Sequence, residues 1–364
     1  MKFNTPREQL LKPIQTIIGA VERRQTMPIL SNFLFRNING HLVITATDLE
    51  LEISATTEIE AEGDSITVPG RKLLDICKSL PEVNEITFSS SGEKAEIKSG
   101  KSRFTLATLN ATDFPLVEEA EAQQSISLKQ NQLSDLIDST NFAMAQQDVR
   151  YYLNGLLLEL NEKDLTAVAT DGHRLALATA EVSHSSDTRQ VILPRKAVHE
   201  LGRILSSHEG DLELVLSANH LQAQVGDIHF VTKLIDGKFP DYQRVIPISH
   251  ELVIEVDREL LRAGLMRASI LSNEKYRGIR LGVTAGLMKI QAHNPEQEEA
   301  EEELEVIYDG PELEVGFNVS YLLDVLNTLE SENVQLLLQD SNSSLLMQSE
   351  DAQHCKYVVM PMRL

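Results

Sequence analysis

The sequence predicts an α+β fold made of three repeats of one unit, each with two helices packed on antiparallel sheets. Three observations predict it. When the 364 residues are split near residues 123 and 248, helix-like patterns recur at offsets of 123 and 127. A Phe-Pro pair recurs 125 residues apart. Between these landmarks, apolar and polar residues alternate as they do in antiparallel strands. The length agrees, because roughly 100–200 residues per domain gives two or three domains.

The first helix of each repeat is indicated by apolar residues at helical spacing. These helices are expected at 7–18, 131–142 and 258–269. Thr5 and Glu8 have the spacing of a capping box, with Pro6 at the first helical position. Pro13 lies inside the pattern, so we expect this helix to be distorted or to start late. A strand followed by the second helix is expected within 66–80, 191–205 and 315–329.

The remaining segments read as strands with Val, Ile, Thr and Leu at a period of two. The last strand of each repeat is expected at 103–109, 229–235 and 356–362. Alternating runs at 41–54 and 164–179 place Asp48 and Asp171 at the same point, 123 residues apart. No His lies beside Asp48, so this position favours a turn role. The expected domains are 1–122, 123–248 and 249–364.

The charge is distributed unevenly. With 33 basic and 55 acidic residues, the net charge of −22 argues against a nucleic-acid partner if it is spread evenly. The six helical windows nevertheless sum to +4, so the acidic excess falls on the strands and loops. One explanation is that the basic residues simply lie on solvated helix faces. The other is that the helices share a surface that binds a polyanion, because the electrostatic potential follows the local charge.

Several classes of protein are disfavoured by composition. A 42% apolar fraction is ordinary for globular protein, so extensive disorder is not expected. No run approaches the ~18–20 apolar residues of a membrane span, and residues 1–12 lack a signal-peptide core. Only Cys77 and Cys355 are present, which predicts a reducing, cytoplasmic setting without a disulfide framework.

Longer motifs carry a family resemblance over the whole chain, in order. They are TMPILSN at 26–32, QQDVRYYLNG at 146–155, ATDGHRL at 169–175, FPDYQRVIP at 239–247, SNEKYRGIRL at 272–281, NPEQEEAEE at 294–302 and YVVMPMRL at 357–364. With these motifs the chain resembles the bacterial sliding clamps, the beta subunits of DNA polymerase III. The resemblance implies three domains of the DNA-clamp fold and a ring-shaped head-to-tail homodimer with helices lining the hole. Ring closure also removes unpaired edge strands.

The resemblance implies three sets of site residues. Positions that contact DNA, or that head lining helices, are Arg24, Arg71, Lys72, Gln146, Gln147, Arg150, Tyr151, Arg195 and Lys196. A groove for short, partly apolar peptides would use Arg150, Tyr152, Leu153, Thr170, Gly172, His173, Arg174, Leu175, Pro240, Arg244, Val245, Asn318, Tyr321, Ser344, Val358, Met360, Pro361 and Met362. The dimer interface would use Lys72, Phe104, Leu106, Ile270, Leu271, Glu298 and Glu301.

The implied function is non-catalytic: sequence-independent retention on double-stranded DNA and tethering of partners. The implied partners are a second copy of the chain, the replicative polymerase catalytic subunit, the clamp loader, translesion polymerases and repair proteins, with no cofactor, metal or membrane. An enzyme using Asp148, Asp171 and His173 is the alternative, but no nucleophile, phosphate-loop or zinc motif is present. The acidic run 296–305 lacks the spacing of a Ca²⁺ loop. A protein-only scaffold with the same groove is a third possibility.

Overall fold

A computed structural model of the chain describes residues 1–22, 27–117, 121–182, 188–206, 209–247 and 250–363. The chain divides into two compact units. Unit 1 consists of Met1–Leu133 and His199–Leu234, and unit 2 of Ser134–Val198 and Ile235–Leu364. The second predicted repeat is therefore shared between the units, because its strands extend the sheets of both neighbouring repeats.

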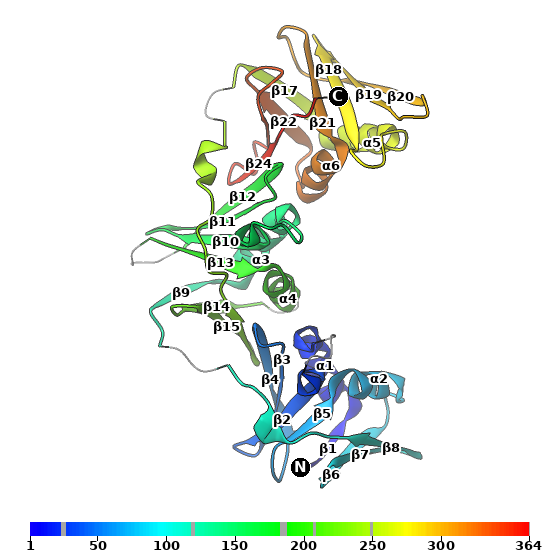
Figure 1. The fold of residues 1–364 in the computed structure, drawn as a ribbon, viewed down its shortest axis with the longest axis vertical. Helices are drawn as coiled ribbons and strands as arrows, with labels where there is room; N and C mark the ends of the chain where they lie inside the picture. The colour runs from blue at the N-terminus through cyan, green and yellow to red at the C-terminus, as the bar shows by residue number, and fades with distance from the viewer. Residues whose placement is uncertain (23–26, 118–120, 183–187, 207–208, 248–249, 364) are drawn as a thin grey trace. The chain divides into compact units, whose positions relative to one another are not determined.

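Unit 1 contains an eight-stranded and a four-stranded antiparallel sheet (Figure 1). The order of the larger is β5 (Ile66–Pro69), β2 (Asn32–Ile38), β3 (His41–Thr47), β4 (Leu51–Glu60), β16 (Ile228–Lys233), β15 (His220–Val225), β14 (Asp211–Leu216) and β9 (Gln124–Lys129). The order of the smaller is β1 (Lys2–Pro6), β6 (Glu85–Ser91), β7 (Lys94–Ser99) and β8 (Ser102–Ala107). β4 pairs with β16, so strands of two repeats form one sheet.

Unit 2 repeats this arrangement. Its larger sheet has the order β13 (Arg189–Pro194), β10 (Gly155–Leu160), β11 (Asp164–Thr170), β12 (Arg174–Glu181), β24 (Cys355–Val359), β23 (Leu345–Gln348), β22 (Asn333–Leu338) and β17 (Leu252–Asp257). Its smaller sheet has the order β20 (Glu299–Glu305), β19 (Leu287–His293), β18 (Gly278–Thr284) and β21 (Leu313–Asn318). Here β12 pairs with β24 across the next pair of repeats.

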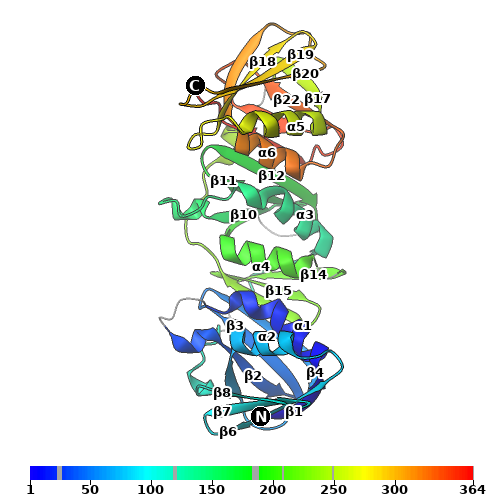
Figure 2. The ribbon, with the colours of Figure 1, turned by 90° about the vertical axis from the view of Figure 1, so that its right-hand side faces the viewer.

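Six α-helices are present in the described residues, and each begins directly after a strand. They are α1 (Arg7–Ile17), α2 (Gly70–Ser79), α3 (Gln130–Thr140), α4 (Arg195–Leu205), α5 (Arg258–Ser269) and α6 (Val319–Thr328). Within unit 1, α1 packs against α2, and within unit 2, α5 packs against α6 (Figure 2). The predicted pair of helices per repeat and about eight strands per repeat are therefore confirmed in the part of the chain that the structure describes.

The start of α1 differs from the prediction. Thr5 belongs to β1, and its hydroxyl donates to the Gln9 side chain instead of capping a helix N–H. Pro6 is the N-cap residue, so the expected capping box is absent. The helix nevertheless starts at Arg7 and runs without interruption through Pro13. Leu10, Ile14 and Ile17 are completely buried. We attribute the tolerance of Pro13 to this packed apolar face, which stabilises the helix more than one missing backbone hydrogen bond costs.

The repeated aspartates occupy the same turn in two sheets. In the β3–β4 turn, Oδ1 of Asp48 accepts hydrogen bonds from the N–H groups of Glu50 and Leu51. In the β11–β12 turn, Oδ1 of Asp171 accepts from the N–H groups of His173 and Arg174. The turn role predicted for these aspartates is therefore confirmed.

Candidate functional site

An apolar row crosses the large sheet of unit 2 on one face. Seven successive strands contribute to it, β12 with two residues and each of the others with one, and neighbours on adjacent strands pair in register. Its members are Ile192, Leu157, Val168, Leu177, Leu175, Val358, Leu346 and Leu337. All are buried, and they form the floor of the candidate groove.

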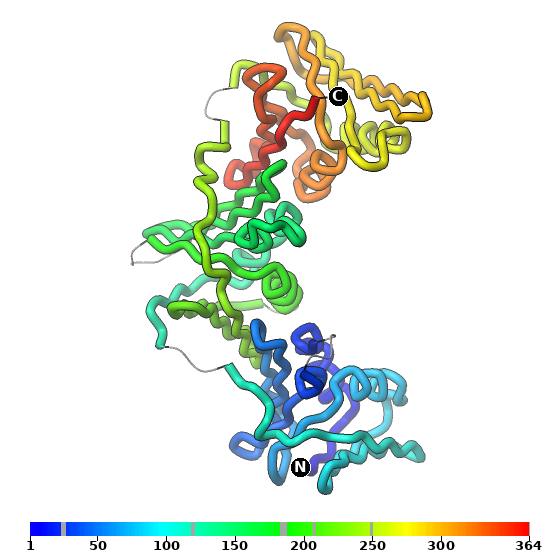
Figure 3. The backbone as a smooth tube through the Cα atoms, in the orientation of Figure 1, coloured from blue at the N-terminus to red at the C-terminus, as the bar shows by residue number. Residues whose placement is uncertain are grey.

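The row is covered by the segment that connects β16 to β17. Figure 3 allows residues 235–247 to be followed toward β17. Phe239 and Tyr242 from this segment are buried against the row, whereas Val245 is only partly buried. Leu153 enters from the other side, with Tyr152 half-buried beside it. The cover therefore leaves apolar side chains partly open at its margin, as a peptide-binding slot requires.

Arg174 organises one wall of this candidate groove. Its Nη2 donates to the Phe142 carbonyl at 2.8 Å, and its Nη1 donates to Asp324 of α6. Its guanidinium lies over the Tyr321 ring, 4.6 Å from the centroid, a cation–π arrangement. The His173 ring stacks with the Tyr321 ring, and their centroids are 6.4 Å apart. The wall is thus a fixed, planar surface of stacked rings.

The loop before β10 forms an adjoining rim. Arg150 pairs with Asp148 and donates to the Asp171 carbonyl, which links this loop to the β11–β12 turn. Asn154 holds the loop by donating to the Asp148 carbonyl and accepting from its N–H. The Arg150 hydrogen bonds lower the pKa of Asp148 to about 2. Asp148 is therefore ionised at neutral pH and unsuited to act as a general base.

The end of the chain lies beside these elements. The N–H of Met360 donates to the His173 carbonyl, and the N–H of Met362 donates to the Gly316 carbonyl of β21. The strand predicted at 356–362 therefore ends at Val359, and the last residues form an extended tail. Met360, Pro361 and Met362 are partly exposed, so the tail offers apolar surface.

The structure brings most of the predicted groove residues together in unit 2. Leu153, Leu175 and Val358 share the buried cluster, and Thr170, His173, Arg174 and Tyr321 form its wall. Pro240 is exposed, and the Arg244 side chain is 85% exposed and pairs with Asp241. Sequence reasoning missed Phe142 and Asp324, the partners of Arg174. No local pattern could have found them, because they lie far along the chain from Arg174.

The predicted DNA-contacting residues differ in their surroundings. Arg71, Lys72, Gln146, Gln147, Arg150, Tyr151 and Lys196 are exposed. Arg24 lies outside the described residues. Arg195 is only half-exposed, and its Nη1 donates to the Met144 carbonyl at 2.9 Å. Burial and the nearby Arg174 lower the pKa of Arg195. Arg195 thus has a structural partner that its position at the head of a helix did not reveal.

The predicted interface residues fall on both units. Phe104 and Leu106 lie on β8, at the edge of the small sheet of unit 1, and Lys72 is exposed on α2. Ile270, directly after α5, is 76% exposed, and Leu271 is partly buried. Glu298 and Glu301 are exposed at β20, the corresponding edge in unit 2.

Comparison with known proteins identifies the family. Three family models match in order: the N-terminal domain of the DNA polymerase III beta subunit at residues 1–118, its central domain at 127–241 and its C-terminal domain at 243–363. The chain belongs to the family of the DNA polymerase III beta subunit. The beta sliding clamp of Pseudomonas putida is 53% identical and that of Escherichia coli 48% identical, each over 100% of both chains.

Solved sliding clamps agree with this assignment. A Pseudomonas aeruginosa clamp bound to griselimycin matches at a TM-score of 0.97 with 53% identity, and a Caulobacter crescentus clamp at 0.94 with 36%, both over 100% of both chains. The chain is therefore a DNA sliding clamp. It is a processivity subunit rather than an enzyme, as predicted.

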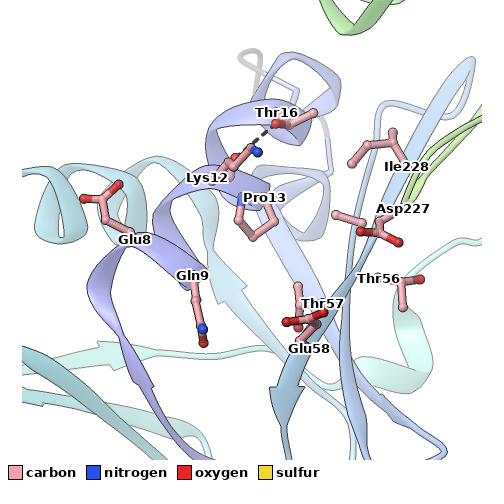
Figure 4. A pocket seen from close by; sticks show the side chains of 11 residues that line it. Glu8, Gln9, Lys12, Pro13, Thr16, Thr56, Thr57, Glu58, Asp227 and Ile228 are labelled. Atoms are coloured by element: carbon pink, nitrogen blue, oxygen red, sulfur yellow. Dashed lines mark hydrogen bonds between the residues drawn. The ribbon is translucent and has the colours of Figure 1, made fainter. Parts of the chain in front are cut away.

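Two further hollows are lined by helix residues together with strand or loop residues. The one in unit 1, about 350 Å³, lies between α1 and β4, with Lys12 and Pro13 facing Thr57 and Glu58 (Figure 4). One in unit 2, about 730 Å³, is lined by Asp135, Asp138 and Asp351 among others. Carboxylates predominate among the charged groups of both hollows, and we assign neither hollow a ligand.

Among the described residues, no group of three or more His, Cys, Asp or Glu could hold a metal ion, and no helix could cross a membrane.

Proposed function

We propose that two copies of this chain close a ring by pairing β8 of one with β20 of the other. The two large sheets support this. In each, the last strand of one repeat pairs antiparallel with the fourth strand of the preceding repeat: β16 with β4, and β24 with β12. β8 and β20 are the corresponding strands of the first and third repeats. Both lie at sheet edges without such a partner among the described residues. We propose domains 1–122, 123–248 and 249–364 on the same basis.

Charge and exposure at these edges support the pairing. β20 reads EAEEELE, whereas β7 and β8 together carry three cations, Lys94, Lys98 and Arg103, against the single carboxylate of Glu96, which pairs with Lys98 and Arg103. Opposite potentials favour correct association and fast encounter. Exposed Ile270 gives the contact an apolar component that would otherwise face solvent. Lys72 with Glu298 or Glu301 would add rim ion pairs worth about 0–1 kcal/mol each.

A double substitution tests this interface. Ile270→Ala with Leu271→Ala removes the apolar contact, and we expect sedimentation at low micromolar concentration to shift from dimer to monomer. Val253→Ala is the matched control, because Val253 is 45% exposed in the same unit but lies on β17, at the edge of the larger sheet. A dimer of unchanged stability in the double variant would contradict the assignment.

We propose that DNA contact is made through Arg24, Arg71, Lys72, Gln146, Gln147, Arg150, Tyr151, Arg195 and Lys196 and carries no sequence information. Support comes from the exposure of most of these side chains and from the small positive charge of the helices. Fewer guanidinium donors are available to phosphates than the sequence suggests, because Arg7, Arg195 and Arg258 direct N–H groups to backbone carbonyls. Few phosphate contacts give a shallow salt dependence, about −0.9 in log–log slope per contact.

Retention on DNA of different topology tests this mechanism. On nicked circular duplex, we expect the assembled clamp to remain bound through moderate salt, and linearisation to release it by sliding off the ends. Lys196→Ala with Arg71→Ala should change retention on circles little, because the topological link does not depend on individual phosphate contacts. Equal release rates from circular and linear DNA would contradict encirclement.

We propose that the groove binds short, partly apolar peptides of the replicative polymerase catalytic subunit, the clamp loader, translesion polymerases and repair proteins. The buried row and the stacked wall of His173, Arg174 and Tyr321 support this. A cytoplasmic location is proposed with it, supported by two free, buried cysteines.

Removing residues 360–364 takes away the Met-rich tail and tests the groove. We expect griselimycin binding measured by calorimetry to fall at least tenfold while the dimer mass is unchanged. Unchanged affinity would contradict the groove.

A further inference from the structure

A third hollow, of about 400 Å³, lies at the end of the small sheet of unit 2. It is formed where β18 begins, where β19 ends and where the chain terminates, near the end marked C in Figure 1. Asn273, Tyr276, His293, Pro295, Met362 and Arg363 are among its lining residues. Except for Met362, none of these belongs to the groove described above.

The hollow adjoins the proposed groove at one shared residue, Met362. Met362 belongs to both, because the tail that begins with the Met360–His173 hydrogen bond leads directly into the hollow. Asn318, a groove position, donates from Nδ2 to the Tyr276 carbonyl at 3.2 Å. Met362 and Asn318 therefore connect the proposed groove positions with Tyr276 and the hollow.

The chemistry of this hollow differs from that of the other two. None of its eight lining residues is acidic, whereas the hollows beside α1 and α3 contain several carboxylates. Arg363 is exposed, and no side-chain hydrogen bond or ion pair of Arg363 is found in the described part of the chain. Tyr276 is 56% exposed, and Lys275 lies over its ring at 5.2 Å. In a chain of net charge −22, this is a local site for a negative group beside an aromatic surface.

We propose that the hollow is a docking site for an acidic segment that flanks the apolar motif of partner peptides, and this rests on the groove of the proposed function. The motif occupies the groove, and the flanking carboxylate meets Arg363 while its neighbour packs on Tyr276 and Met362. Charge-assisted hydrogen bonds to guanidinium are roughly twice as strong as neutral ones, so a short extension adds affinity. Partners with and without such a flank would then compete unequally for one groove.

Peptides with and without the flank test this inference. The probes are a labelled core peptide, Gln-Leu-Met-Leu-Phe, and the same peptide with Glu-Phe-Glu added at its N-terminus or at its C-terminus. Fluorescence anisotropy should show one extended peptide binding about five- to tenfold tighter than the core. In Arg363→Glu this gain should disappear, while core-peptide affinity stays the same. An extension of Lys-Phe-Lys should restore the gain in Arg363→Glu.

Matched controls make the outcomes distinct. Lys163→Glu changes the same charge on the exposed β10–β11 turn of unit 2 and should keep the full gain. Tyr276→Ala should reduce the gain in affinity that the extension provides without altering the affinity for the core peptide. If neither extension binds tighter than the core to the wild-type chain, the inference is wrong and the groove stands. If the core and extended peptides all fail to bind or to be displaced by griselimycin, the groove assignment fails, and this inference fails with it.

Discussion

The two large sheets have the same strand order and the same turns, but their corresponding rows differ in polarity. In unit 2 the row is apolar throughout. In unit 1, the register places polar side chains at most of the equivalent positions. Successive strands there present Thr67, Leu34, Thr45, Ser54, Glu52, Val231, Gln222 and Val215.

The polar row of unit 1 binds its covering segment by hydrogen bonds, in addition to the apolar contact between Phe114 and Leu34. The Thr67 hydroxyl donates to the Leu109 carbonyl and accepts from the Leu109 N–H. Glu52, only 7% exposed, accepts the N–H of Val117 at 2.8 Å. In unit 2 the corresponding cover is held by the apolar contacts of Phe239 and Tyr242. The same backbone arrangement therefore carries a largely polar row in unit 1 and, in unit 2, the apolar row that forms the floor of the proposed groove.

Exchanging the central row residue should produce the largest effect. Leu175→Glu introduces into unit 2 a carboxylate at the position equivalent to Glu52. The residue of unit 2 that corresponds to Arg36 is Glu159, so the new carboxylate would have no such cation beside it. An unpaired buried carboxylate costs about 3–5 kcal/mol. We expect a lower urea-unfolding midpoint and loss of griselimycin binding by calorimetry. Leu175→Met, similar in volume, should cost less than about 1.5 kcal/mol. A Glu variant as stable as the Met variant would show that row polarity is unimportant.

The turn beside the row allows a second exchange. Gly172 has φ 87°, and the equivalent residue of unit 1 is Leu49 with φ 80°. In Gly172→Leu, the left-handed conformation costs about 1–2 kcal/mol. The new Cβ would also lie 3.1 Å from Nη2 of Arg150 and displace its guanidinium. We expect reduced thermal stability and several-fold weaker griselimycin binding. Gly172→Asn should lose less, because Asn tolerates this conformation, and equal losses would exclude backbone strain as the cause.

Glu52 should make the stability of unit 1 depend on pH. Burial raises its pKa above the usual 4.5, although the Val117 N–H and Arg36 oppose this shift. A raised folded-state pKa means that the folded chain binds the proton more tightly. The stabilisation by protonated Glu52 is therefore complete below about pH 4.5 and is lost as pH rises through the folded-state pKa. Glu52→Gln cannot ionise. The free energy of unfolding of Glu52→Gln, measured with urea, should exceed that of the wild type at pH 7. This difference should shrink as the pH is lowered to 5. An advantage independent of pH would contradict this assignment.

The smallest effect is expected at the turn of unit 1. Leu49→Gly relieves the left-handed strain but increases the freedom of the unfolded chain, which costs about 0.5–1 kcal/mol. The two contributions largely cancel, so the net gain in thermal stability should stay below about 1 kcal/mol. Leu49→Ala keeps the strain and provides the control. A gain in the Ala variant equal to that in the Gly variant would point to the exposed leucyl side chain instead.

Much of the local structure could be predicted from the sequence. The helix expected at 258–269 is observed over those residues, and the aspartate turns were recognised from their repetition. The groove positions were available through the family resemblance. The capping box failed because Thr5 continues a strand, which its local spacing could not reveal. The structural role of Arg195 was also missed, because its Met144 carbonyl partner is fixed only when the chain folds.

By itself, the sequence determined the three repeats, the places of their helices and strands, and the turns between them. These depend on neighbours two to four residues apart, so periodicity records them. Only the tertiary structure decided that β4 joins β16 and β12 joins β24, that one sheet row is polar and the other apolar, and that Arg174 is held by Phe142 and Asp324. Those contacts bring together residues remote in sequence, and their stability depends on packing and burial that no local pattern encodes.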